Sequence, residues 1–119
     1  MAVARRAEEV VVAYLQAQGF AIVARNLKLG RLEIDIVARR DALAVMVEVR
    51  ARGRTAFERP LASVAGRKRM HLVRAAERLW RLHLAKVAGV ERMRIDVAGV
   101  TFGRDGVADV EYIAGAITA

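Results

Sequence analysis

The part of the sequence best suited to chemistry is a pair of acidic residues, Asp35 and Glu48, in two neighbouring apolar runs. The runs, Leu32–Arg39 and Leu43–Ala51, are separated by a short polar stretch, which predicts a β-hairpin. With a two-residue turn at 41–42, Asp35 lies directly opposite Glu48. Alternation puts Glu33, Asp35, Glu48 and Arg50 on one face, and Leu32, Ile34, Ile36, Val45, Val47 and Val49 on the other, which we expect to be the core.

Two carboxylates directly opposite one another in a sheet repel, and a divalent cation relieves that repulsion. Magnesium prefers oxygen ligands, so the candidate metal ligands for Mg²⁺ or Mn²⁺ are Asp35, Glu48 and the backbone carbonyl of Val49. Arg50 shares the face of the acids and is placed to meet a phosphate. The alternative is an ordinary solvated sheet face, on which Glu48 pairs with Arg50 along the strand.

The rest of the chain predicts two helices and three further strands around this hairpin. The expected helices run from Arg5 to Gln18, ended by Gly19, and from a cap at Ser63 to a point before Gly89. The expected strands are Phe20–Arg25, Arg92–Val100 and Val107–Ile113, the last two joined by a turn at 103–106. The core stripe of the second helix is Leu72, Val73, Ala76, Leu79, Trp80 and His83. The predicted fold class is α/β, one domain over residues 1–119, with a mixed β-sheet of about five strands flanked by helices in the order αβββαββ.

The charge of the chain favours a polyanionic partner. Lysine and arginine number 21 against 13 acidic residues, which gives a net charge of +8 and a pI of about 11.2. The expected partner is nucleic acid, most simply DNA, although a GC-rich genome explains the arginine content equally well. The loop Arg52–Pro60 follows the acids directly and is rich in arginine. The predicted nucleic-acid-binding residues are Arg52, Arg54, Arg67 and Lys68.

Several function classes are excluded or disfavoured. The chain has no cysteine, which excludes disulfides, thiolate zinc sites and cysteine nucleophiles. No run approaches the ~18 apolar residues of a membrane span, and no long apolar run follows Arg5 and Arg6. We therefore expect a cytoplasmic protein without a membrane partner. His71 and His83 are too far apart in sequence for a helical metal pair.

The order of the motifs resembles a known group of nucleases. Glu8 in the first helix, Glu-Ile-Asp at 33–35 and Glu-Val-Arg at 48–50 resemble the PD-(D/E)xK nuclease superfamily. More closely, the chain resembles the YraN family of bacterial proteins, whose fold is similar to that of archaeal Holliday-junction resolvases and restriction endonucleases. That closer resemblance rests on Ala7-Glu8, Gly19-Phe20, residues 33–36 and 47–52, Lys68 and residues 94–97.

The resemblance implies a restriction-endonuclease-like fold and an endonuclease that uses Mg²⁺ or Mn²⁺ and acts on DNA, with branched or junction DNA among its candidate substrates. It implies that Asp35 and Glu48 are metal ligands, that Glu8 approaches the metal from the first helix, and that Arg50 stands where the superfamily usually has its catalytic lysine. Arginine stays charged and cannot act as a base, so metal-held water would be the nucleophile and Arg50 would stabilise phosphate charge. Leu32 stands where the family has glycine.

Other interpretations remain open from the sequence. The chain is alternatively a non-catalytic nucleic-acid-binding module that keeps a nuclease-like fold, or a scaffolding subunit whose basic surface meets an acidic protein. Glu8 alternatively stabilises the helix dipole, and Asp96 is an ion-pair partner of an arginine. Lys68 is either a solvated helix residue or a residue that reaches back toward a phosphate near the acids. A free edge strand and an apolar tail with Tyr112, Ile113 and Ile117 would suit a homodimer.

Overall fold

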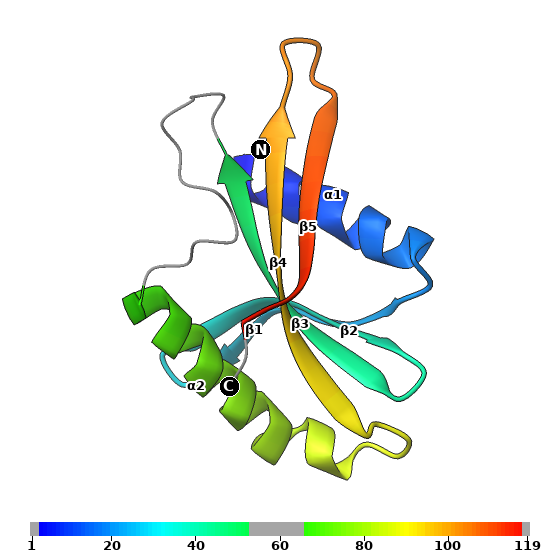
Figure 1. Ribbon diagram of the computed structural model, residues 1–119, viewed down its shortest axis with the longest axis vertical. Helices are drawn as coiled ribbons and strands as arrows, with labels where there is room; N and C mark the ends of the chain where they lie inside the picture. Colours follow the sequence, from blue (N-terminus) through cyan, green and yellow to red (C-terminus); the bar gives the residue numbers. More distant parts are fainter. Residues whose placement is uncertain (1–2, 53–65, 118–119) are drawn as a thin grey trace.

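The structure, a computed structural model, describes residues 3–52 and 66–117 (Figure 1). Its elements are α1 (Val3–Ala17), β1 (Ala21–Leu29), β2 (Leu32–Arg40), β3 (Leu43–Arg52), α2 (Gly66–Leu82), the short 3-10 helix η1 (Leu84–Lys86), β4 (Arg92–Phe102) and β5 (Ala108–Ile117). The predicted α/β class, the five-stranded mixed sheet and the order αβββαββ are confirmed.

The five strands lie in the sheet in the same order as in the chain, β1-β2-β3-β4-β5. Every neighbouring pair is antiparallel except β3 and β4, which are parallel. A parallel pair needs a long crossover connection, and α2 lies in it. The strands fan out strongly about the middle of the sheet, so that their ends point in different directions (Figure 1).

Both faces of the sheet are buried, each under one helix. The apolar stripe of α1 covers one face, and that of α2 covers the other, so β3 alternates between the two cores. The α1 side gathers Ala7, Val11, Leu15, Ile36, Ala38, Val45 and Val47. The α2 side gathers Val37, Ala44, Met46, Leu72, Ala75, Ala76 and Leu79. The expectation of one core face on the hairpin was wrong, because the helices sandwich the sheet.

The hairpin of β2 and β3 has the predicted register. Its turn is formed by Asp41 and Ala42, and pairing runs from Arg40 opposite Leu43 to Ile36 opposite Val47. Asp41 has a φ of 53°, a left-handed conformation that Asp tolerates better than most residues. The two-residue turn fixes this register.

The first helix ends where the sequence predicts. Gly19 has a φ of 89°, and its N–H donates to the carbonyl of Gln16. The N–H of Phe20 reaches back to the carbonyl of Leu15 at 2.9 Å, a helix-terminating pattern. Arg40 from β2 donates to the carbonyl of Gln18 at 2.8 Å, which ties the end of α1 to the sheet.

Three expectations need correction or fall outside the description. The first strand is longer than predicted, because Ala21–Leu29 forms a second hairpin with β2 through a turn at Gly30. His83 is exposed, because α2 ends at Leu82 and Leu84 of η1 fills the core instead. Ser63, the expected cap, lies outside the described residues.

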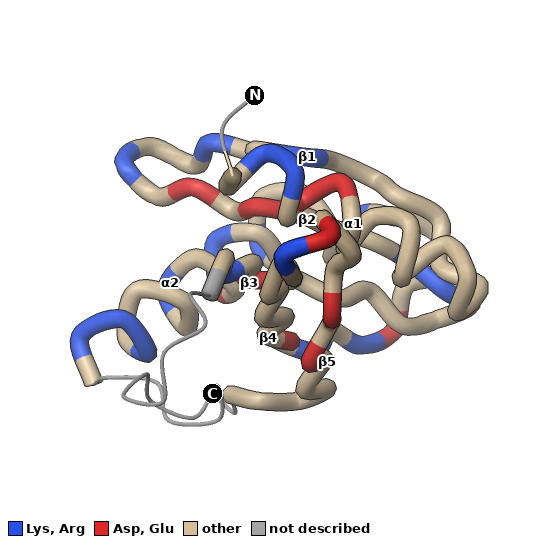
Figure 2. Tube along the Cα trace, turned by 90° about the horizontal axis from the view of Figure 1, so that it is seen from above, with Lys and Arg blue, Asp and Glu red and all other residues tan. Residues whose placement is uncertain are grey.

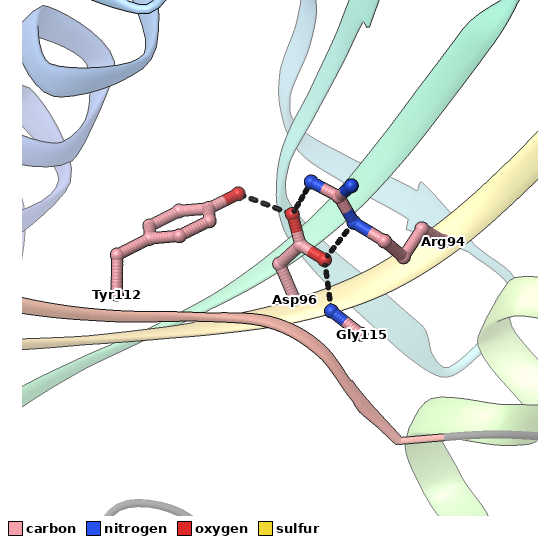
Figure 3. Close-up of polar contacts among 4 residues, drawn as sticks. All are labelled: Arg94, Asp96, Tyr112 and Gly115. Carbon is pink, nitrogen blue, oxygen red and sulfur yellow. Dashed lines mark hydrogen bonds and ion pairs between the residues drawn. The ribbon is translucent and has the colours of Figure 1, made fainter.

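A buried carboxylate joins β4 to β5 (Figure 3). Asp96 is fully buried and accepts hydrogen bonds from Arg94 at 2.7 and 2.9 Å, from the backbone N–H of Gly115 at 2.8 Å, and from the hydroxyl of Tyr112. The predicted ion pair of Asp96 with an arginine is confirmed. Ile117 is buried too, so the expected apolar tail is part of the fold.

Within the described part of the chain, no helix is long and apolar enough to cross a membrane.

Candidate active site

The acidic residues meet where β2 separates from β3. Pairing of these strands ends at Ile36 opposite Val47, one position short of Asp35 and Glu48. Here the carboxylate of Asp35 takes the place of a backbone carbonyl as hydrogen-bond acceptor: its Oδ2 accepts a hydrogen bond from the N–H of Val49 at 2.8 Å. Asp35 therefore lies opposite Glu48 as predicted, but at a fork between the strands.

The backbone of β2 is irregular at this fork. Ile34 packs in the core under α2, whereas Ile36 packs in the core under α1, although the two residues would share a face of a regular strand. The sequence prediction that both lie on one face was wrong for this reason. On the other side of β2, the pairing with β1 passes over Asn26, whose φ is 50°. Asp35 thus lies between two irregular positions.

Glu48 lies on the α2 face of β3 and is paired with a residue of that helix. Oε1 of Glu48 is 3.0 Å from Nζ of Lys68. The side chain of Glu48 is 11% exposed, whereas that of Lys68 is 45% exposed. The lysine therefore reaches from the solvent side into the fork.

Glu8 reaches the site from the other layer. Glu8 follows Ala7 in α1. The side chain of Ala7 is fully buried between the helix and the sheet, and Glu8 is half-buried. Its Oε1 is buried and accepts no hydrogen bond from the described residues. A buried oxygen without a partner destabilises a fold, so this oxygen is suited to accept a hydrogen bond or to contact a cation.

The electrostatics of the fork show that the acids lie close together. The pKa of Asp35 is raised to about 6, mainly because burial disfavours the charged form. The hydrogen bond from Val49 opposes this rise, the negative charges of Glu48 and Glu8 add to it, and the positive charge of Lys68 opposes it. The charges of Glu8 from α1 and Glu48 from β3 thus both act on Asp35 of β2.

The oxygen-rich donor set fits a hard divalent cation. Asp35 and Glu48 offer carboxylate oxygens, and the unpartnered oxygen of Glu8 offers a third. Among residues 3–52 and 66–117, no three acidic, histidine or cysteine side chains form a closed metal-binding group, and Glu48 is turned toward Lys68. A cation would therefore have to draw the three carboxylates together.

The other residues that the sequence predicts for the site are less directly connected to Asp35 and Glu48. Arg50 is half-buried and follows Glu48 on the α2 face of β3, but no hydrogen bond or ion pair within the described residues joins it to Asp35 or Glu48. Val49 contacts Asp35 through its N–H, and its carbonyl stays a predicted ligand. Arg67 is exposed at the start of α2. The side chain of Arg52 and all of Arg54 lie outside the description.

Basic residues flank the fork on two elements. Figure 2 shows Lys and Arg along α2 and around the hairpin of β1 and β2, with acidic positions of β2 between them. Arg78 of α2 donates to the carbonyl of Leu29 at 3.2 Å, which holds the helix against the hairpin tip. The exposed cations of α2 and of the β1–β2 hairpin are Arg25, Lys28, Arg31, Arg40, Arg67, Lys68, Arg69, Arg74, Arg78 and Arg81.

An apolar hollow of about 420 Å³ on another part of α2 is separate from this site. It is lined by Trp80, Met93 and Ile117, among others, and by none of the three acids. Arg94 also lines it, but the guanidinium is held by Asp96. We therefore place the candidate site at the fork.

The sequence left the role of Lys68 open and gave no functional role to Asn26 or Arg78. Lys68 is far from Glu48 in sequence, and only the docking of α2 on the sheet brings the two together. The one usable signal for Asn26 was its residue type, because asparagine adopts positive φ more readily than most residues.

Comparison with known proteins gives a family. The model of the family described as "Uncharacterised protein family UPF0102" matches residues 7–100. A UPF0102 protein of Sorangium cellulosum (strain So ce56) is 54% identical over 112 residues, which cover 94% of this chain and 78% of that protein. A UPF0102 protein of Burkholderia pseudomallei (strain 1710b) is 41% identical over 92 residues, which cover 76% of this chain and 61% of the relative.

Among solved structures, the chain is weakly similar to that of Pyrococcus furiosus SfsA in complex with Ca²⁺. It shares 13% identity and a TM-score of 0.41, over 94% of this chain and 62% of the other. Nothing about this chain follows from a likeness of that size.

Proposed function

The chain belongs to the UPF0102 family. From its motifs and the geometry of the fork, we propose that it is a restriction-endonuclease-like domain that hydrolyses phosphodiester bonds of DNA with a divalent cation, Mg²⁺ or Mn²⁺. The chain spans 78% of one relative and 61% of another, so the proposal concerns this domain.

One observation carries the proposal: among the described residues, the charges of Glu8 from α1 and Glu48 from β3 both act on Asp35 of β2 at a fork in the sheet, and the ion pair given for these acids is that of Glu48 with Lys68. Oε1 of Glu8 is buried without a partner among the described residues, and the pKa of Asp35 is raised to about 6. Lys68 supplies one positive charge, at Glu48. A divalent cation would supply the remainder, which supports a metal-dependent reaction over a purely structural cluster.

In the proposed reaction, a bound Mg²⁺ or Mn²⁺ would supply positive charge to the phosphate and lower the pKa of a coordinated water. Asp35 and Glu48 would hold the cation, with Glu8 completing the set from α1. The hydrogen bond from Val49 fixes the direction of the Asp35 carboxylate. Burial of these side chains limits competition from bulk water.

The bonds balance as a hydrolysis. The oxygen of water bonds to phosphorus, the bond from phosphorus to one sugar oxygen breaks, and the leaving oxygen takes up a proton. The products are a phosphomonoester and an alcohol. Cations of α2 and of the β1–β2 hairpin would contact neighbouring phosphates, which favours binding without reading of the base sequence.

A second candidate is a non-catalytic nucleic-acid-binding module. Arg50 at the position of the superfamily's usual lysine favours it, because arginine cannot exchange a proton with the reacting groups. In this second function the basic surface binds nucleic acid, and Asp35 and Glu48 have a structural role.

The deciding experiment compares wild type with Asp35→Asn and Glu48→Gln. Both substitutions keep the shape of the side chain, and the amide introduced by Asp35→Asn still offers an oxygen to the N–H of Val49. Each protein is titrated with Mn²⁺ and incubated with branched, single-stranded and duplex DNA at fixed salt. Cleavage by wild type alone supports the nuclease, and the products name the preferred DNA structure.

DNA binding without cleavage in all three proteins, with no binding of Mn²⁺, supports the module instead. Absence of DNA binding at moderate salt would contradict both candidates.

A further inference from the structure

We infer that Lys68, from α2, is the residue that contacts the scissile phosphate in the proposed hydrolysis, rather than Arg50 from β3. The inference rests on the proposed function and names a catalytic residue for it. It moves the positive group of the site from β3 to α2, the helix of the crossover between β3 and β4.

The contact with Glu48 places the ammonium of Lys68 at the acids. Nζ of Lys68 is 3.0 Å from Oε1 of Glu48. Lys68 thus directly contacts one of the two proposed metal ligands. Arg50 shares their face of the sheet but makes no hydrogen bond or ion pair with either acid among the residues described.

Lys68 also remains open to a substrate. Its side chain is 45% exposed, whereas that of Glu48 is 11% exposed, so the lysine lies on the outer side of the pair. An ammonium has three N–H donors, and Glu48 needs one of them. The others can donate to a phosphate oxygen that approaches from solvent.

The surroundings of Lys68 suit a phosphate. Arg67, His71 and Arg74 line an open hollow at the start of α2 on the same helix. Adjacent phosphates of a nucleic acid strand would find cations there while one phosphate reaches the fork. Lys68 does not line this hollow but belongs to the same turn of α2 as Arg67 and His71, and it contacts Glu48.

The charges of the site also balance with Lys68 in place. Three carboxylates carry three negative charges, one ammonium and one divalent cation carry three positive charges, and the set is neutral. In this role Lys68 contributes hydrogen bonds and positive charge, and no proton transfer is required of it.

The test uses the absence of cysteine from the chain. Lys68→Cys introduces a single thiol, which 2-bromoethylamine converts to an ammonium side chain with the same number of atoms as lysine. Iodoacetamide on the same thiol gives a neutral adduct of similar bulk. Lys86→Cys, on exposed η1 beyond the other end of α2, receives the same treatments as a control.

Two quantities are measured for each protein: steady-state cleavage of the DNA that wild type prefers, and affinity for Mn²⁺ without DNA. We expect Lys68→Cys to lose about 100-fold or more in kcat, as when one charge-stabilising donor is removed. The aminoethyl adduct restores kcat to within about tenfold, and the neutral adduct does not. Mn²⁺ binds Lys68→Cys at least as tightly as wild type, because Glu48 is released.

The inference is overturned if Lys68→Cys retains kcat within about threefold while wild type cleaves and binds Mn²⁺, a result that leaves the proposed function intact. Equal rescue by both adducts overturns it too, because a merely structural role needs bulk and no charge. If wild type neither cleaves DNA nor binds Mn²⁺, the proposed function fails, and the inference fails with it.

Discussion

Oδ2 of Asp35 accepts a hydrogen bond from the backbone N–H of Val49, so a side chain closes the ladder between β2 and β3 at the point where their backbone pairing ends. The bond holds the Asp35 carboxylate beside Glu48 even though the two repel. The protein thus uses backbone geometry to keep an unfavourable pair of charges together.

The first prediction concerns divalent cations and stability. Because a cation relieves repulsion that exists only in the folded state, Mn²⁺ should stabilise wild type, by about 2.7 kcal/mol at roughly 100 times its Kd. Asp35→Asn and Glu48→Gln should lose most of this gain. Thermal unfolding with Mn²⁺ and then with excess chelator measures it. An equal gain in Asp35→Asn would mean that the cation binds elsewhere.

The second prediction concerns pH in the presence of chelator. The pKa of Asp35 is about 6 in the folded state against 3.8 for the free side chain, so the folded state binds the proton more tightly. This group therefore adds stability as pH falls through 6, fully present below 3.8 and lost as pH rises through 6. The difference in unfolding free energy between wild type and Asp35→Asn, measured by urea from about pH 7.5 to about pH 4, should follow that curve. A flat difference would contradict the raised pKa.

The third prediction separates stability from cation binding at Glu8. Its Oε1 is buried without a partner among the described residues and its charge repels Asp35, so Glu8→Gln should stabilise the cation-free protein by about 1 kcal/mol. The same substitution should weaken Mn²⁺ binding, because a carboxylate ligand is lost. Urea unfolding in chelator and Mn²⁺ titration measure the two effects. Glu9→Gln, at the exposed neighbouring position, should change neither. Loss of stability in Glu8→Gln would indicate a structural role for the carboxylate.

The fourth prediction concerns the buried cluster on β4 and β5. Asp96 is fully buried and neutralises Arg94, so Asp96→Ala should cost about 3–5 kcal/mol. Tyr112→Phe removes one of its donors and should cost less, about 1.5 kcal/mol. Neither change should alter the Kd for Mn²⁺, provided that the variant is folded. A changed Kd for Mn²⁺ in Tyr112→Phe would show that the Asp96 cluster is coupled to Asp35 and Glu48, which contradicts this prediction.

The position of Asp35 beside Glu48 could be predicted from the sequence because the two residues belong to one hairpin, whose strands are close together in the chain. A two-residue turn at Asp41 and Ala42 fixes the register of β2 and β3, and the register places Asp35 beside Glu48. The elements and their order could be predicted for a similar reason, since apolar periodicity and glycine positions are properties of short segments.

What the sequence could not predict depends on contacts between distant segments. The packing of Ile34 and Ile36 in different cores follows from the irregular backbone of β2 at the fork, because the two residues would share a face of a regular strand. The pairing of Lys68 with Glu48 exists only after α2 docks, and the exposure of His83 follows from the end of α2 at Leu82. No local pattern carries this information.

The order of the strands has a consequence for how the molecule folds. The β1–β2, β2–β3 and β4–β5 junctions close over short turns, which costs little loop entropy, whereas β3 meets β4 only after the chain returns through α2. The three carboxylates belong to the local part of the chain, and Lys68 belongs to the returning part. In stopped-flow experiments we expect Val45→Ala to slow refolding and Leu79→Ala mainly to speed unfolding. The three carboxylates would then come together early in folding, and Lys68 would reach them when α2 docks.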